Sequence, residues 1–202
     1  MKAAAQVISF VFHPLLIATY LVLTLGLIFP AMLMIRPEHL VLVTVFVFGF
    51  TFVMPLLNLW LFKIWGTIRS FQLPTQKERI LPFVFICGIY TMVSLLFYYR
   101  LPFPSHLNKV VIIITLLVIT ATALNFFIKV SVHSLAMGGW IGILLPLIQF
   151  SPDLLIPTAG VIVLTGVVAS SRLALQAHTL REISMGLVAG LLTSYGGMVL
   201  LF

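Results

Sequence analysis

Seven long apolar runs, separated by short polar breaks, constrain the fold of this chain more than any other feature. A helix that spans the hydrocarbon core of a bilayer needs about 20 mostly apolar residues. Only 7% of the 202 residues are charged, which is too few to solvate a water-soluble globule of this size. We therefore predict an all-α fold, a polytopic membrane bundle of six or seven transmembrane helices that forms a single domain over residues 1–202. The predicted spans are residues 5–29, 40–62, 80–99, 109–128, 135–150, 154–170 and 183–201.

The fifth and sixth runs are shorter than a usual span. We expect either that these helices extend into their polar flanks or that the pair tilts or partly re-enters the membrane. The first run follows Lys2, and no small-residue cleavage site comes after it. We therefore expect this run to be retained as a span and not removed as a signal peptide. Within it, His13 and Pro14 could line the bundle, and the simpler interpretation is a helix kink with an internally bonded histidine.

Seven crossings place three polar segments on the same side of the membrane. We call the side of the N-terminus side A, and the segments around 64–79, 129–134 and 171–182 all fall on it. A single active site at one membrane surface requires such a grouping. Side A also carries eight of the 11 Lys and Arg residues, which favours a cytoplasmic side A. Four of these side A residues could belong to a functional site. Without them, side A carries four Lys and Arg residues and the opposite side, side B, carries three, so side A could face either the cytoplasm or the periplasm.

The net charge of +7 does not indicate a nucleic-acid partner, because the basic residues are spread over membrane-edge loops. With one cysteine, Cys87, the chain has no disulfide framework. The four acidic residues are scattered and provide no carboxylate cluster, so we expect neither a metal nor another cofactor. The expected partners are the lipid bilayer and a membrane lipid.

The segment from Ser171 to Gly186 introduces Arg172, His178 and Glu182 into a chain that otherwise avoids charge. Residues four apart on a helix share one face, so we expect His178 and Glu182 to form a hydrogen bond. A carboxylate behind an imidazole fixes its tautomer and raises its basicity. The simpler alternative is an interfacial helix whose arginines reach the lipid headgroups.

Two further side A segments add candidate groups. The segment from Lys129 to Ser134 contains His133, which would share a stripe with Lys129 if the preceding helix continued through it. Two histidines suit phosphoryl transfer, because one can attack phosphorus while the other protonates the leaving oxygen. In residues 69–82, Lys77 and Arg79 could clamp phosphate oxygens, although an ordinary basic loop in contact with acidic lipids would look the same.

Together these segments resemble the type 2 phosphatidic acid phosphatase superfamily, which comprises membrane phosphatases that work through a phosphohistidine. The family's third motif is S-R-x5-H-x3-D, commonly followed by a glycine four residues on. Its places are occupied here by Ser171, Arg172, His178, Glu182 and Gly186. The resemblance covers a motif-bearing core of about residues 69–190. It implies that His178 is the nucleophile, that Glu182 is the carboxylate orienting it, and that Arg172 binds phosphate.

The family's second motif, P-S-G-H, is represented by Ser131 and His133. The resemblance implies that His133 is the general acid and that Ser131 contributes its amide or hydroxyl to phosphate binding. The first motif, K-x6-R-P, is absent as written, and Lys77 with Arg79 and Pro82 resembles a compressed form of it. Valines replace the proline and glycine of the second motif, and Glu182 replaces the usual aspartate of the third.

The implied activity is metal-independent hydrolysis of a lipid phosphomonoester or diphosphate, of the phosphatidate, phosphatidylglycerophosphate or polyprenyl phosphate type. The expected location is the inner (plasma) membrane of a bacterium. The altered motifs keep an alternative open, in which the chain is a non-catalytic membrane relative that acts in transport, scaffolding or lipid headgroup binding.

Overall fold

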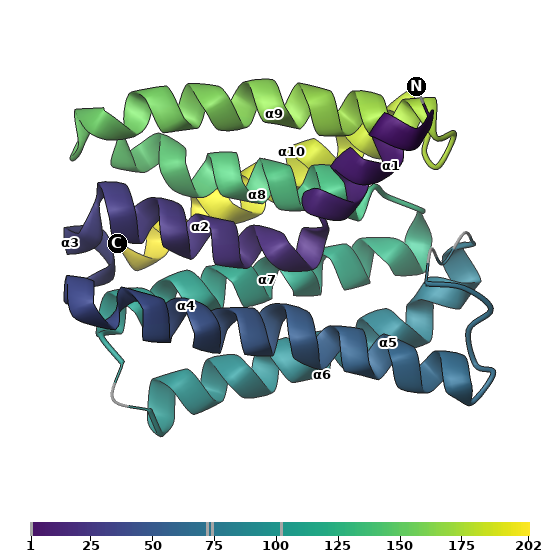
Figure 1. The fold of residues 1–202 in the computed structure, drawn as a ribbon, viewed down its shortest axis with the longest axis horizontal. Coiled ribbons are helices and arrows are strands. Elements are labelled where there is room, and N and C mark those ends of the chain that lie inside the picture. Colours follow the sequence, from purple (N-terminus) through teal and green to yellow (C-terminus); the bar gives the residue numbers. More distant parts are fainter. Residues whose placement is uncertain (1, 72, 74, 102) are drawn as a thin grey trace.

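The computed structural model describes residues 2–71, 73, 75–101 and 103–202, and all regular secondary structure among them is helical (Figure 1). The first half of the chain forms α1 (Lys2–Val11), α2 (Pro14–Ile28), α3 (Pro30–Leu33), η1 (Pro37–His39), α4 (Leu40–Phe48), η2 (Gly49–Val53), α5 (Met54–Ile64) and α6 (Gln76–Tyr99). The second half forms α7 (Ser105–Phe127), α8 (Val132–Leu147), η3 (Pro152–Leu154), α9 (Leu155–Ala174) and α10 (Leu180–Leu201).

Five helical segments of the described chain are long and apolar enough to cross a membrane, which confirms the predicted helical membrane bundle. They are Pro37–Ile64, Gln76–Tyr99, Ser105–Phe127, Pro152–Ala174 and Leu180–Leu201. Helices α1 and α2 meet at 57° and together make a sixth possible span. The remaining predicted span corresponds to α8, an apolar helix of 16 residues. The other run that looked short extends at both ends, because η3 and α9 together reach from Pro152 to Ala174.

Prolines shape the first two spans. Pro14 is the first residue of α2, where a missing N–H is tolerated, and the side chain of His13 caps that helix by accepting a hydrogen bond from the N–H of Leu15 at 3.3 Å. The predicted kink with an internally bonded histidine is therefore confirmed. In the next span Pro55 cannot donate to the carbonyl of Thr51, and the hydroxyl of Tyr90 on α6 donates to that oxygen instead, at 2.7 Å.

Helices α8 and α10 pack more closely than any other pair because glycines line their contact. A Cβ on Gly186 would lie 2.5 Å from the carbonyl oxygen of Ser131, and one on Gly190 would overlap the carbonyl of Leu135. Gly138 and Gly142 of α8 contact the backbone of α10 in the same way. Small residues let two helix backbones approach within the membrane, where burial of apolar surface drives little association.

The side A segments lie together at one end of the bundle, as the alternation of spans predicts. Figure 1 shows the N-terminus and the α5–α6, α7–α8 and α9–α10 connections at the right-hand end, with the C-terminus, α3 and the α6–α7 connection at the other. The polar connections of side A therefore surround one end of the helical core.

Candidate active site

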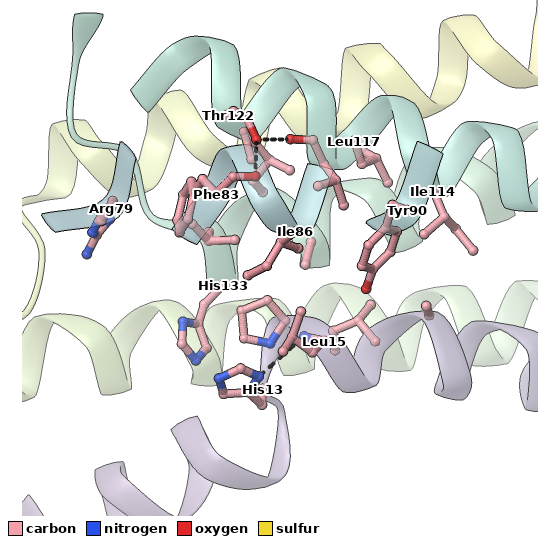
Figure 2. Close-up of a pocket in the computed structure, with 18 of the residues that line it drawn as sticks. His13, Leu15, Arg79, Phe83, Ile86, Tyr90, Ile114, Leu117, Thr122 and His133 are labelled. Atoms are coloured by element: carbon pink, nitrogen blue, oxygen red, sulfur yellow. Dashed lines mark hydrogen bonds between the residues drawn. The ribbon is translucent and has the colours of Figure 1, made fainter. Parts of the chain in front are cut away.

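Side chains from four parts of the chain converge on one cavity at side A. The cavity has a volume of about 180 Å³, and its polar lining residues are His13, Arg79, His133, Arg172 and His178, with Tyr90 and Thr122 deeper inside. Figure 2 shows His13 and His133 facing Arg79 across this space, with α2 and α8 on one wall and α6 and α7 on the other. Four predicted site residues, three of them on separate helices, thus meet at one place.

His178 and Glu182 form the expected hydrogen bond, but not as two residues of one helix. His178 precedes α10, whose N-cap is Thr179, and its Nδ1 lies 2.8 Å from Oε2 of Glu182. The same oxygen accepts the backbone N–H of Thr179 at 3.2 Å, while Oγ1 of Thr179 accepts the N–H of Glu182 at 3.3 Å. This reciprocal capping box starts the helix and also aims the carboxylate at the imidazole.

The contact with Glu182 determines which nitrogen of His178 is available for chemistry. The carboxylate accepts a hydrogen bond from Nδ1–H, so the lone pair of the neutral ring is on Nε2. The pKa of His178 is lowered from 6.5 to about 4. Burial is the largest cause, the hydrogen bond to Glu182 opposes it, and the positive charges of Arg79, Lys129 and Arg172 add to the lowering. His178 is therefore neutral at pH 7, which a nitrogen nucleophile requires.

Arg79 is almost fully buried, at 6% exposure, and ties two connections of side A together. Its Nε donates to the carbonyl of Leu73 at 2.8 Å, and its Nη1 donates to the carbonyl of Val130 at 3.0 Å. Leu73 has a φ of 46°, in the left-handed region that a leucine seldom adopts, and this conformation is held where its carbonyl receives the guanidinium. The other three of the five guanidinium N–H groups make no hydrogen bond to the residues that the structure describes.

Arg172, in the last turn of α9, lines the same cavity, and its buried Nε has no hydrogen-bond partner among the described residues. A buried guanidinium N–H without a partner is unfavourable, because its hydration is lost and nothing replaces it. Nearby, Lys129 donates from Nζ to the carbonyl of Ala177 at 3.1 Å. Arg79, Lys129 and Arg172 thus surround a site whose one carboxylate is Glu182, so the positive charge is in excess and suits an anion.

His133 lies in the first turn of α8 and not on a continuation of the preceding helix. Helix α7 ends at Phe127, Ile128 is extended, and Ser131 caps α8, so the expected stripe through Lys129 does not form. His133 instead faces the N-terminal helix: its Nε2 lies 3.1 Å from the carbonyl oxygen of Ser9.

The N-terminal segment reaches the site in two ways, through Ser9 of α1 and through His13, which follows α1 and caps α2. Its Ser9 also forms a hydroxyl–hydroxyl bond of 3.1 Å to Ser171, the neighbour of Arg172. Between α1 and α2, the ring of His13 lies 5.8 Å from that of His133, centroid to centroid. The backbone carbonyl of Ser9 could not be identified from the sequence, whereas His13 was a possible bundle-lining residue and does line the cavity.

Two predicted phosphate-binding residues do not line the cavity. Lys77 is exposed in the first turn of α6. Ser131 is fully buried, and its Oγ accepts the N–H of Ser134 at 3.3 Å and the hydroxyl of Ser134 at 3.0 Å, so its side chain serves as a helix cap. Within the described ranges, no group of three or more His, Cys, Asp or Glu side chains could hold a metal ion.

The backbone of Ser131 joins the two histidine-bearing segments. Its N–H donates to the carbonyl of Glu182 at 3.1 Å, which fixes the start of α8 against the first turn of α10.

Comparisons of the chain with known protein families, with characterised proteins and with solved structures found no match.

Proposed function

We propose that this membrane protein is a metal-independent phosphatase that hydrolyses a lipid phosphomonoester or diphosphate through a phosphohistidine. The observation that carries the proposal is the Nε of Arg172, buried without a hydrogen-bond partner in the part of the chain that the structure describes, on the same cavity as a neutral His178 held by Glu182. A phosphate group would give the guanidinium its missing partner and bring phosphorus to the imidazole.

In the first step, the Nε2 lone pair of His178 attacks phosphorus, and the bond from phosphorus to the ester oxygen breaks. Protonated His133 gives its Nδ1 proton to that leaving oxygen, while its Nε2–H stays bonded to the carbonyl of Ser9. The products are a free alcohol, a phosphohistidine at His178 and a neutral His133.

In the second step, His133 takes a proton from water as the water oxygen attacks phosphorus, and the nitrogen–phosphorus bond breaks. Inorganic phosphate leaves, and His178 regains its lone pair. Arg172 and the free N–H groups of Arg79 are suited to stabilise the charge on the phosphoryl oxygens in both steps.

The direct test measures phosphate release by purified protein from phosphatidate, phosphatidylglycerophosphate and polyprenyl diphosphate, with and without a chelator. We expect release that the chelator does not affect, and an acid-labile phosphoenzyme when the reaction with ³²P-labelled substrate is quenched. His178→Ala should give neither. Full activity of His178→Ala contradicts the phosphohistidine, and inactivity of the wild-type protein on all three lipids favours the non-catalytic alternative.

A further inference from the structure

The cavity continues well beyond its cationic end into the helical core. On α6, Arg79, Phe83, Ile86 and Tyr90 all line it, and their spacings of four, three and four residues place them on one helix face. At about 1.5 Å per residue, this stripe is about 16 Å long. It begins at a guanidinium and ends at an aromatic ring, and Figure 2 shows Ile86 pointing into the space between these ends.

The opposite wall of the cavity also changes from polar residues at side A to apolar residues deeper in the core. On α8, His133 is followed by Ala136 and Trp140, and α2 adds Ala18 and Leu21 beyond its own histidine. All the charged and imidazole groups that line the cavity are thus at side A, and the deeper walls are mainly aliphatic and aromatic.

The polar atoms of the deeper part are already satisfied or enclosed. The hydroxyl of Tyr90 donates to the carbonyl of Thr51, and that of Thr122 donates to the carbonyl of Val118 at 2.8 Å. The indole Nε1 of Trp140 has no hydrogen-bond partner among the described residues, but it is buried and closed off from the cavity. The deeper cavity therefore presents little to a glycerol or sugar group and suits hydrocarbon.

The volume decides how much hydrocarbon fits. An apolar protein cavity of about 150 Å³ holds one benzene molecule, which has six carbons. The 180 Å³ here also includes the space beside the cations. The cavity is therefore wide enough for one chain and too small for two chains joined through glycerol.

We propose that the ligand of this cavity is a phosphate carried directly on a single aliphatic chain, alkyl or isoprenoid. Its first six to eight carbons, roughly, occupy the space between α6 and α2–α8, on the benzene scale of cavity volume. The phosphate lies against Arg172 and Arg79. This inference rests on the proposed function for the identity of the headgroup site, and it selects one substrate class among the lipid phosphates considered above.

Binding of phosphonates, whose carbon–phosphorus bond cannot be hydrolysed, tests the inference independently of catalysis. The readout is the thermal unfolding midpoint of the full chain in detergent, titrated with methylphosphonate, dodecylphosphonate, farnesylphosphonate or dioleoyl phosphatidate. We expect both single-chain phosphonates to bind more tightly than methylphosphonate and phosphatidate. The ratio of the dodecyl and farnesyl affinities distinguishes an alkyl from an isoprenoid ligand.

A matched pair of tryptophan variants locates the chain. Ile86→Trp fills the middle of the cavity, whereas Phe85→Trp places the same side chain on the exposed face of the same turn. Ile86→Trp should weaken dodecylphosphonate binding at least about tenfold, the scale of a blocked apolar pocket, and leave methylphosphonate binding unchanged. Phe85→Trp should change neither. Ala18→Phe, from the opposite wall, should repeat the selective loss even if Ile86→Trp is poorly folded.

Two results overturn the inference. One is phosphatidate binding that is as tight as dodecylphosphonate binding, and the other is unchanged dodecylphosphonate binding in Ala18→Phe. Phosphate release from dodecyl phosphate is measured separately. Selective binding without release would contradict the proposed phosphatase activity and leave the single-chain site standing.

Discussion

The imidazole Nε2 of His133 lies 3.1 Å from the backbone carbonyl oxygen of Ser9. A carbonyl can only accept a hydrogen bond, so Nε2 carries a proton and Nδ1 is the nitrogen left for the reaction. Helix α1 therefore fixes the tautomer of His133, as Glu182 fixes that of His178. The hydroxyl bond between Ser9 and Ser171 holds α1 in this position against α9.

Deletion of residues 2–11 should remove this support and impair the general acid. We expect kcat/KM for alkyl phosphates to fall by about 10²–10⁴, the usual contribution of general acid catalysis. Aryl phosphates such as p-nitrophenyl phosphate should lose less, because their leaving group needs no proton. Phe10→Ala, on the exposed face of α1, is the control and should leave the ratio of the two rates unchanged. Equal losses on both substrates would indicate a structural defect only.

Glu182→Gln and Thr179→Ala should separate catalysis from helix capping. The neutral amide cannot stabilise the positive charge that develops on His178, so we expect kcat to fall by about 10²–10⁴. Thr179→Ala removes the cap bond to the N–H of Glu182 and should cost about 1 kcal/mol of stability with kcat close to that of the wild type. Phosphate release and thermal unfolding measure the two effects, and wild-type kcat in Glu182→Gln would contradict the orienting role.

The two arginines of the cavity should respond in opposite ways to replacement by methionine. Arg172→Met removes a buried Nε that has no partner in the described ranges, so the anion-free protein should be as stable as the wild type or more so. Its unfolding midpoint should no longer rise with vanadate. Arg79→Met leaves the carbonyls of Leu73 and Val130 without their donor, at a cost of about 1–3 kcal/mol for each buried group. Stabilisation of Arg172→Met by vanadate would exclude Arg172 as an anion ligand.

The lowered pKa of His178 predicts how stability depends on pH. The unfolded chain binds a proton at this histidine near pH 6.5, whereas the folded chain binds it only near pH 4. Between these values the unfolded state holds more protons, so the unfolding midpoint should fall as the pH decreases from 6.5 to 4. His178→Asn should show a flatter profile over this range. Parallel profiles would mean that other groups control the acid sensitivity.

Packing between α8 and α10 predicts a contrast between two glycines of α10. A methyl group at Gly190 would overlap the carbonyl of Leu135, so Gly190→Ala should destabilise the protein by about 1–3 kcal/mol. Gly196 has open space around it, and Gly196→Ala should be neutral or stabilising by up to about 1 kcal/mol because alanine favours the helix. Thermal unfolding in detergent compares the two variants, and equal midpoints would contradict the close approach.

The spans and their grouping could be predicted because membrane insertion depends on the length and polarity of each run. The pairing of His178 with Glu182 could be predicted from their spacing, although the geometry is that of a capping box and not of a helix face. This contact joins residues only four apart, so a local sequence pattern was enough to predict it.

The remaining parts of the site depend on contacts that only the folded chain creates. Ser9 and His133 are 124 residues apart, and the acceptor is a main-chain oxygen that any residue would supply. Lys77 and Arg79 look equivalent in sequence, but on α6 the side chain of Lys77 is exposed and that of Arg79 is buried in the core. The direction in which a helix faces depends on its neighbours, which a single short segment does not specify.

Glu182 acts from both its main chain and its side chain. Its carbonyl receives the N–H of Ser131 and so locates the helix that carries His133, while its carboxylate holds His178. Glu182 therefore sets the separation between His133, the proposed acid, and His178, the proposed nucleophile. Bending or sliding of the outer helices as the bilayer changes thickness would leave that separation unaltered, so the proposed chemistry would be mechanically insulated from the membrane around it.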